Sequence, residues 1–328
     1  MDDMIVDIRD LHVNFSIYEG VLRVLNGVNF RVGRGEKIAL IGEAGCGKTT
    51  TVKSIMRILP IPPAEIVSGE VFVEGRDVLK MSTQELQNMR RKTVSMIFQD
   101  PTAALNPVFK VGNQIGDIIK YSQTRSGEKI QKEEIREKTI QVLKEVAMPD
   151  PERIMKNYPI QLSGGMRQRI CIAMALVSAT KLLIADEPGT NLDVTIQDQV
   201  LRLIGGLVRK RKTSVILISH ALGAVKGLVD RVYVMYAGNM VEAAKTEDLF
   251  SNPLHPYTKA LFNAVPKLTG GGIPEGIGGR IPNYLDPPKG CRFHPRCDHA
   301  MPKCRRKAPP LYDMGVGHEV ACYLYGGE

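Results

Sequence analysis

The feature that most constrains the fold is a glycine-rich segment between an apolar run and a helical pattern. Residues 42–49 are Gly-Glu-Ala-Gly-Cys-Gly-Lys-Thr, which matches the pattern G-x-x-x-x-G-K-[ST]. The run Lys37–Ile41 before it is typical of a buried parallel strand, and a helix is expected from Lys48 to about Leu59, where prolines follow. This order predicts a phosphate-binding loop at the end of a parallel strand.

Each part of this segment has a chemical reason. Glycines let the backbone turn tightly, so that several N–H groups point inward at phosphate oxygens, and the following helix adds its positive N-terminal end. The Lys48 ammonium would reach the β- and γ-phosphates, and the Thr49 hydroxyl would ligate Mg²⁺. The residues expected to bind the nucleotide here are Gly42, Gly45, Cys46, Gly47, Lys48, Thr49 and Thr50.

A pair of carboxylates follows a second apolar run. Asp186 and Glu187 come directly after Leu182–Ala185. A carboxylate at the C-terminal end of a parallel strand faces the crevice where ligands bind. Asp186 suits the surroundings of Mg²⁺, and Glu187 is suited to orient or deprotonate an attacking water. The sequence therefore predicts a nucleoside triphosphate site with a hydrolytic carboxylate.

Strand and helix patterns alternate along most of the chain. Apolar runs at Leu182–Ala185 and Val215–Ile218 flank a helical stretch, which predicts an α/β fold with a mostly parallel sheet and helices on both faces. Regular periodicity fades near the C-terminal end, where Pro, Gly and Cys are frequent. The expected parts are an ATP-binding core of residues 1–110 and 166–250, an inserted helical subdomain of residues 111–165, and an irregular C-terminal extension of residues 251–328.

The chain shows no pattern for entering a membrane. No segment reaches the roughly 18–20 apolar residues that span a bilayer, and Met1–Met4 lack the basic and apolar regions of a secretory signal. We therefore expect a cytoplasmic protein, for which any role at a membrane would have to come through a partner. The net charge of +9 alone is compatible with nucleic acid, an anionic membrane surface or anionic small ligands.

A third motif lies at the end of the helical subdomain. Residues 162–169 are Leu-Ser-Gly-Gly-Met-Arg-Gln-Arg, which resembles the signature sequence of ABC ATPases. The resemblance implies the ABC form of the P-loop NTPase fold, in which each ATP lies between the phosphate loop of one domain and the signature of another. Ser163, Gly164 and Gly165 offer a hydroxyl and backbone N–H groups at the start of an expected helix. A P-loop kinase is excluded by this motif.

The same resemblance assigns roles to residues outside the three motifs. Gln99 follows the apolar run that ends at Phe98 and is similar to the family's glutamine that senses Mg²⁺ and contacts the membrane subunit. His220 is similar to the switch histidine at the γ-phosphate. Together with Glu187, these two are the expected catalytic residues. An aromatic near the N-terminus should stack on adenine, and Tyr18 and Phe15 both stay candidates.

The C-terminal part carries a narrower resemblance. Asn252–Thr258 and Gly290–Cys297 match the start and the end of the extension found in ATPases of oligopeptide and dipeptide importers. This implies an ATPase at the cytoplasmic face of the membrane that powers peptide import, with oligosaccharide or nickel import of the same family as alternatives. The implied partners are a second, related ATPase subunit, two membrane-spanning permease subunits and, through the permease, an extracytoplasmic solute-binding protein.

An ABC ATPase acting on nucleic acid or ribosomes is the alternative from another class. The basic net charge fits it. However, aromatic residues make up only 5% of the chain and tryptophan is absent, so groups for base stacking are scarce. The chain also lacks a second ATPase cassette. We therefore expect transport, with no nucleic-acid partner.

Four of the six cysteines cluster near the C-terminal end, with five, six and seventeen residues between them: Cys291, Cys297, Cys304 and Cys322. Disulfides are disfavoured in the cytoplasm, and structural zinc sites usually include a short C-x₂₋₄-C pair. A [4Fe–4S] cluster tolerates varied spacing, and some importer ATPases resembling this chain carry one in this extension. We therefore favour a structural [4Fe–4S] cluster over Zn²⁺, and leave open a redox-sensing role and a ligand set that includes His294, His299 or His318.

Overall fold

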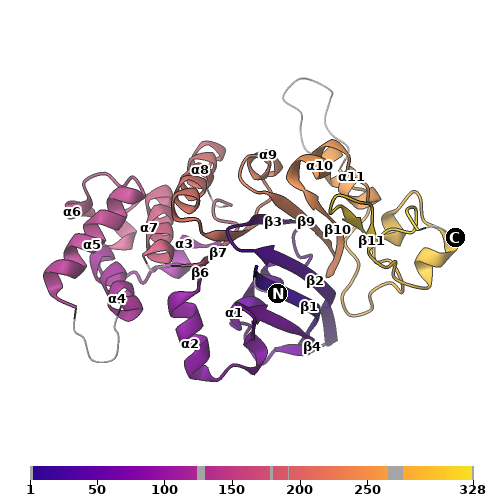
Figure 1. The fold of residues 1–328 in the computed structure, drawn as a ribbon, viewed down its shortest axis with the longest axis horizontal. Coiled ribbons are helices and arrows are strands. Elements are labelled where there is room, and N and C mark those ends of the chain that lie inside the picture. Colours follow the sequence, from indigo (N-terminus) through magenta and orange to yellow (C-terminus); the bar gives the residue numbers. More distant parts are fainter. Residues whose placement is uncertain (1–2, 124–129, 178–179, 191, 265–275, 327–328) are drawn as a thin grey trace. The chain divides into compact units, whose positions relative to one another are not determined.

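The computed structural model describes residues 3–123, 130–177, 180–190, 192–264 and 276–326 (Figure 1). The chain divides into two units. Unit 1 comprises Met1–Lys80 and His220–Glu328, and unit 2 comprises Met81–Ser219. Unit 2 contains the whole of the segment expected to be the helical subdomain. The domain boundaries expected from the sequence stay predictions.

Unit 1 contains the phosphate loop and the C-terminal extension. Its elements in chain order are β1 (Met4–Ile17), β2 (Gly20–Gly33), β3 (Lys37–Ile41), α1 (Lys48–Met56), β4 (Ala64–Val73), β5 (Arg76–Asp77), the 3₁₀ turn η1 (Val78–Lys80), α9 (Leu222–Lys226), β9 (Arg231–Tyr236), β10 (Asn239–Lys245), α10 (Thr246–Ser251), α11 (Pro256–Asn263), the 3₁₀ turns η3 (His294–Arg296) and η4 (Pro302–Arg305), β11 (Tyr312–Asp313) and β12 (Glu319–Val320).

Two groups of strands organise unit 1. An antiparallel sheet has the order β2-β1-β4-β5, and a second group has the order β11-β12-β10-β9-β3. β3 runs parallel to β9, with Ile38 opposite Arg231 and Ile41 opposite Val234. Residues 38–41 are fully buried, as expected for a parallel strand covered on both faces. This strand carries the phosphate loop.

The C-terminal extension has more regular structure than the sequence predicts. It contains α11 and the two short strands β11 and β12. β12 pairs antiparallel with β10, with Val320 opposite Glu242. Pairing of two-residue strands depends on partners far away in the chain, so no local periodicity predicts it. The extension is therefore joined to the strands that carry the loop.

The helix after the phosphate loop is shorter than the sequence predicts. α1 ends at Met56 instead of near Leu59, because Arg57 adopts a left-handed conformation with φ 49°. Its N–H donates to the carbonyls of Lys53 and Ser54, which satisfies two of the orphan groups at the helix end. The prolines at 60, 62 and 63 therefore follow a helix that has already ended.

Unit 2 contains the signature and the paired carboxylates. Its elements in chain order are α2 (Thr83–Lys92), β6 (Val94–Ile97), α3 (Pro101–Ala104), α4 (Val111–Gln123), α5 (Lys132–Glu145), α6 (Pro151–Ile154), the 3₁₀ turn η2 (Pro159–Gln161), α7 (Gly164–Leu176), β7 (Leu182–Asp186), α8 (Val194–Arg211) and β8 (Ser214–Ile218).

The strands of unit 2 are parallel, in the order β8-β7-β6. β7 and β8 are buried along their whole length. Figure 1 shows α4, α5 and α6 gathered beside α7, as expected for a helical segment between strand-bearing parts. The predicted α/β class with a mostly parallel sheet is confirmed. Among the described residues, no helix is both long and apolar enough to cross a membrane.

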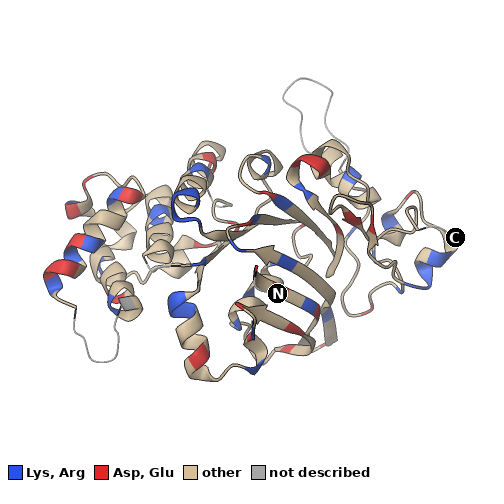
Figure 2. Ribbon diagram, viewed as in Figure 1, with Lys and Arg blue, Asp and Glu red and all other residues tan. Residues whose placement is uncertain are grey.

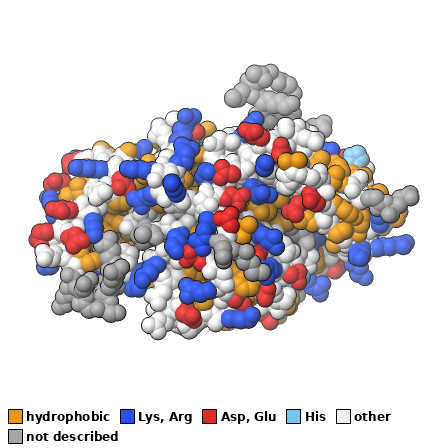
Figure 3. Space-filling model, viewed as in Figure 1, with side chains coloured by type: hydrophobic (Ala, Val, Ile, Leu, Met, Phe, Trp, Pro, Cys, Tyr) orange, Lys and Arg blue, Asp and Glu red, His pale blue; other side chains and the backbone are white. Residues whose placement is uncertain are grey.

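Charged side chains are distributed through both units. Figure 2 shows Lys and Arg on elements of each unit, accompanied by Asp and Glu. On the face drawn in Figure 3, basic side chains are interspersed with acidic ones. On this face, the basic residues that give the chain its net charge of +9 are therefore mixed with acidic residues.

Candidate functional site

The phosphate loop begins directly at the end of β3. Gly42 has φ 149° and Gly47 has φ 108°, in the region that glycine adopts without strain. A Cβ atom on Gly42 would lie 2.1 Å from the Met235 carbonyl oxygen, and one on Gly47 would lie 2.7 Å from the Leu25 side chain. Both positions therefore need glycine for their conformation and for the close approach of neighbouring atoms.

Lys48 lies inside the loop that it follows. Its ammonium is buried and donates to the carbonyl oxygens of Gly42 at 2.8 Å and Glu43 at 2.9 Å. Gly47, the N-cap of α1, has no side-chain cap, so the positive end of the helix is available to an anion. Thr49 and Thr50 belong to the first turn of this helix. The loop is thus built to surround a phosphate group.

Cys46 occupies the interior of the loop. Its side chain is fully buried, and burial raises the pKa of its thiol above the ordinary value. The thiol is therefore neutral near pH 7. It contributes shape to the loop and adds no negative charge beside a bound phosphate.

Unit 2 brings together two of the predicted catalytic residues. The Gln99 amide donates to Glu187 Oε2 at 3.0 Å, and the Thr190 hydroxyl donates to the same oxygen at 3.0 Å. The Glu187 N–H donates to the Ile218 carbonyl at 3.0 Å. Asp186, at the end of β7, is 2% exposed. The Glu187 carboxylate is therefore held in one orientation just beyond a buried strand.

The signature residues begin a helix as expected. Ser163 is the N-cap of α7, and its hydroxyl accepts from the Met166 N–H at 3.3 Å. Gly164 and Gly165 form the first turn, where a Cβ would approach side chains of Leu192 and Ile196 at 3.3 and 3.0 Å. This arrangement leaves backbone N–H groups of the first turn directed outward at the helix start.

The remaining predicted nucleotide contacts lie in unit 1. His220 is exposed and comes two residues after the end of β8 in the chain. Tyr18 is 103% exposed in the turn between β1 and β2. Phe15 is half-buried within β1, opposite Leu22 and Ala64. Of the two aromatic candidates, Tyr18 has the ring free to be covered by a flat ligand.

The four C-terminal cysteines line one cavity of about 20 Å³, together with His255, His294 and His299. His318 instead pairs with the buried Glu242, Nε2 to Oε1, at 2.7 Å. Within the part of the chain that the structure describes, no three His, Cys, Asp or Glu side chains are placed so that they could hold a metal ion. Burial raises the pKa of Cys291 to about 11 and raises those of Cys297 and Cys322.

Several contacts at the site are not predicted by the sequence analysis. Thr190 orients Glu187, and the side chains of Tyr257, Tyr284 and Arg296 contact the phosphate loop from the extension. Tyr257 and Arg296 do lie in the segments that carry the narrower resemblance. Their contact with a loop more than 200 residues earlier cannot be derived from spacing.

Two family models match the chain. The model described as "ABC transporter" matches residues 25–190, and the model described as "Oligopeptide/dipeptide transporter, C-terminal region" matches residues 241–304. The first covers the phosphate loop, the signature and the paired carboxylates. The second covers α11 and three of the four clustered cysteines.

Known proteins match over nearly the full length. A probable peptide ABC transporter ATP-binding protein, y4tR, from Sinorhizobium fredii is 46% identical over 98% of this chain and 95% of its own length. The dipeptide transport ATP-binding protein DppD of Bacillus subtilis is 43% identical over 98% of this chain and 95% of its own length. The oligopeptide transport ATP-binding protein OppD of the same organism is 42% identical over 98% and 88%.

Solved structures show the same fold. The ATP-binding cassette MJ0796 bound to ADP and Pi has a TM-score of 0.65 at 22% identity and covers 74% of this chain and 98% of its own. The cbiO1 protein of Clostridium perfringens has a TM-score of 0.63 at 25% identity, over 76% and 92%. This chain therefore belongs to the ABC transporter family, as an ATP-binding protein of the oligopeptide/dipeptide type.

Proposed function

We propose that this chain hydrolyses ATP to drive the uptake of peptides through a membrane permease. The observation that carries the proposal is the presence, in one chain, of the ABC transporter match and the oligopeptide/dipeptide C-terminal match. The relatives named above are described as peptide, dipeptide and oligopeptide transport proteins. The chain acts at the cytoplasmic face of the membrane, held there by its partners.

The loop residues of unit 1 bind the ATP phosphates. Lys48 gives up its bonds to two loop carbonyls and turns to the β- and γ-phosphates, while the backbone N–H groups of the loop and of α1 hold phosphate oxygens. Thr49 and Gln99 are the proposed Mg²⁺ ligands, and the carboxylate of Asp186 suits the surroundings of the ion. The ring of Tyr18 stacks on adenine, because this exposed ring offers more aromatic surface than the half-buried ring of Phe15.

Glu187 is the proposed catalytic carboxylate. Gln99 and Thr190 both donate to Oε2, so the carboxylate is held in one orientation in which it would accept a hydrogen bond from the attacking water. His220 contacts the γ-phosphate. Ser163, Gly164 and Gly165 bind the ATP held by a partner ATPase, because their N–H groups at the start of α7 suit an anion.

Transport by reconstituted complexes tests the proposal. The chain, its partner ATPase, the permease subunits and the binding protein are placed in vesicles, and uptake of labelled di- and oligopeptides is followed with and without ATP. ATP-dependent uptake by the parent, absent with Lys48→Ala, is the expected result. Uptake of sugars or nickel with no uptake of any peptide would overturn the proposed cargo.

A second, related ATPase is the proposed partner. In this arrangement the signature of each chain completes the ATP site of the other. Purified alone, the chain is expected to be largely monomeric and weakly active, and to gain ATPase activity when the partner is added. Size-exclusion chromatography with light scattering and an ATPase assay check this. A stable, fully active homodimer of this chain would contradict a required second ATPase.

The clustered cysteines are the proposed ligands of a structural [4Fe–4S] cluster. The support is their donor chemistry, because four thiol side chains line one cavity. The cavity of about 20 Å³ is smaller than such a cluster, and no three donors among the described residues are placed to hold a metal ion, so the thiols would have to change position to bind it. When bound, the cluster would supply a covalent cross-link to a segment with few regular elements.

Anaerobic purification tests the cluster. Brown protein with broad absorption at about 400 nm and about four irons per chain is the expected result. The substitution Cys304→Ser should remove the colour and the iron. Colourless parent protein with stoichiometric zinc, or with no metal, would overturn the iron–sulfur assignment and would leave the ATPase function untouched.

A further inference from the structure

Three side chains of the C-terminal extension form hydrogen bonds or an ion pair with the phosphate loop. The Glu43 N–H donates to Tyr257 Oη at 2.8 Å, and Tyr284 Oη donates to the Gly45 carbonyl at 2.8 Å. Arg296 forms a bidentate ion pair with Glu43, from Nη1 to Oε2 at 2.8 Å and from Nη2 to Oε1 at 3.1 Å. The backbone of the loop and its acidic side chain are thus both held from the extension.

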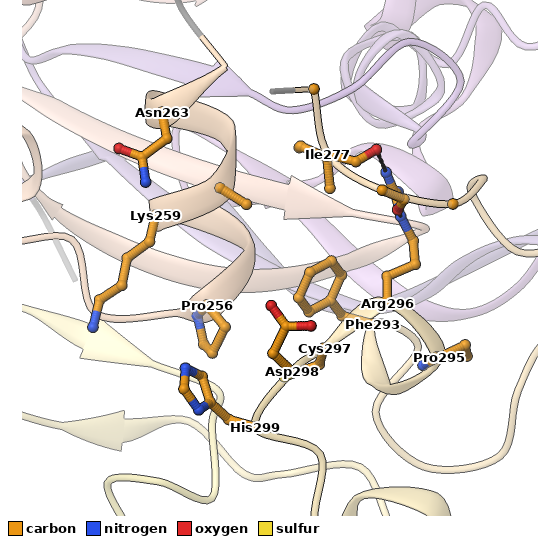
Figure 4. Close-up of a pocket in the computed structure, with 14 residues that line it drawn as sticks. Pro256, Lys259, Asn263, Ile277, Phe293, Pro295, Arg296, Cys297, Asp298 and His299 are labelled. Atoms are coloured by element: carbon orange, nitrogen blue, oxygen red, sulfur yellow. Dashed lines mark hydrogen bonds between the residues drawn. The ribbon is translucent and has the colours of Figure 1, made fainter. Parts of the chain in front are cut away.

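Arg296 is the most firmly fixed of these groups. Its side chain is 4% exposed, and beyond Glu43 it donates to the carbonyls of Gly278 at 2.7 Å and Ile277 at 3.1 Å and to Tyr236 Oη at 3.2 Å. Figure 4 shows the side chain running from η3 to Ile277, with the hydrogen bond drawn. A guanidinium with this many partners keeps one position, so it can fix the group that it pairs with.

Tyr257 is fixed by aromatic packing. Its ring is fully buried and lies 4.6 Å from the ring centre of Tyr236 and 5.4 Å from that of Phe293. Both the acceptor for the Glu43 N–H and the cation for its carboxylate are therefore rigid. The Glu43 carbonyl is also one of the two that accept from Lys48. The contacts of Tyr257 and Arg296 with Glu43 therefore also help to place Lys48, the residue that would bind the phosphates.

Charge makes this contact matter for ATP. Glu43 is a carboxylate within the loop that receives a polyphosphate carrying several negative charges. Left alone, it would oppose binding, because like charges within a few ångströms repel each other strongly where water is scarce. The Arg296 guanidinium neutralises it and turns it toward the extension. The ion pair therefore removes a repulsive group from the phosphates while it fixes the loop.

We propose that the C-terminal extension braces the phosphate loop and that Arg296, acting through Glu43, is a positioning residue for ATP binding. The proposal rests on the binding of ATP by this loop. It gives the extension a part in the nucleotide site. Arg296 itself touches the carboxylate of Glu43, and its effect on ATP is exerted through that side chain and the loop backbone.

Nucleotide affinity in a set of variants tests the brace. Binding of ATP to the full chain in the presence of Mg²⁺ is measured for the parent, Arg296→Gln, Glu43→Gln and the double variant, with thermal unfolding of each recorded without nucleotide. Arg296→Gln should bind ATP about tenfold more weakly, since it frees an unpaired carboxylate near the phosphates. Adding Glu43→Gln should restore affinity to within about threefold of the parent, because the repulsive charge is gone.

The controls separate this role from a general effect on folding. Arg280→Gln removes the same charge from an exposed position of the extension and should leave ATP affinity unchanged. Lys48→Ala loses ATP binding whether or not the brace exists, so it shows that the assay reports on the loop. Arg296→Lys, which keeps the charge but cannot form both bonds to Glu43, should lie between the parent and Arg296→Gln.

The outcomes decide the proposal. Rescue of Arg296→Gln by Glu43→Gln supports the brace, since a purely structural role for Arg296 would not be repaired by removing its partner. An affinity of Arg296→Gln within twofold of the parent overturns it, as does a double variant that stays as weak as Arg296→Gln. If Arg296→Gln does not fold, Arg296→Lys decides: parent-like ATP affinity in that variant also overturns the brace.

Discussion

At the scale of single residues, hydrogen bonds from neighbouring groups fix the backbone and the carboxylate of Glu187. Glu187 has φ 48°, a left-handed conformation that costs a non-glycine residue about 1–3 kcal/mol. Its N–H bond to Ile218 and the two donors on Oε2 hold it there. Strain of this kind is typical of residues that must present a side chain at one angle, which agrees with a catalytic role.

The hydroxyl of Thr190 should contribute to turnover through Glu187. Thr190→Val removes one of the two donors on Oε2 while it keeps the shape of the side chain. Loss of one hydrogen bond to a carboxylate, worth about 1.5–3 kcal/mol, predicts a kcat lower by about tenfold or more, with little change in ATP affinity. Steady-state ATPase kinetics of the complete complex measure both quantities.

Thr190→Ser is the matched control, because it retains the hydroxyl and should keep most of the activity. A Thr190→Val enzyme with parent kcat, or one in which only ATP affinity falls, would show that this hydroxyl does not orient the carboxylate for hydrolysis.

At the scale of elements, the sequence predicts those helices, strands and turns that are set by interactions within a few residues. β3, the phosphate loop and α7 are predicted from sequence because apolar runs, glycines at special φ values and the Ser163 cap act within a few residues. The end of α1 is predicted three residues too late, because the left-handed Arg57 leaves no compositional mark. The β12–β10 pairing and the Arg296–Glu43 ion pair join distant segments, so no periodicity predicts them.

The helix α8 should tolerate and benefit from one substitution. Gly206 lies within this helix on an exposed position, and a Cβ added there meets nothing within 4 Å. Gly206→Ala should raise the free energy of unfolding by about 0.5–1 kcal/mol, because alanine loses less backbone entropy on folding. Urea unfolding followed by circular dichroism measures the change.

Gly42→Ala is the opposing case in the same assay. Its Cβ would lie 2.1 Å from the Met235 carbonyl oxygen at φ 149°, so it should destabilise the protein and abolish ATP binding. A Gly206→Ala protein that unfolds at lower urea than the parent would contradict the helix placement.

At the scale of the whole molecule, Glu242 ties the extension to the strands of unit 1. It is fully buried in β10 and accepts from the N–H groups of Leu254 at 2.7 Å and His255 at 2.9 Å, and it pairs with His318. Two segments of the extension therefore converge on one carboxylate. This carboxylate helps to hold the region from which Tyr257 and Arg296 reach the phosphate loop.

Glu242→Gln should loosen this connection. Glutamine offers one acceptor oxygen and places two N–H donors against donors, so the expected loss is about 2 kcal/mol in the free energy of unfolding. Urea unfolding should show a lower midpoint, and ATP affinity should fall with it. Glu65→Gln, on an exposed position of β4, is the control that should match the parent. Equal midpoints for Glu242→Gln and the parent would contradict a structural tie.

The measurement that tests the central claim most directly is ATP binding and hydrolysis by Glu187→Gln in the assembled complex. Loss of the negative charge weakens the hold on the attacking water and leaves the phosphate loop intact. Turnover should therefore fall by about a hundredfold or more, with ATP affinity close to the parent's, whereas Lys48→Ala should lose binding itself. A Glu187→Gln protein that hydrolyses ATP at the parent rate would contradict the account.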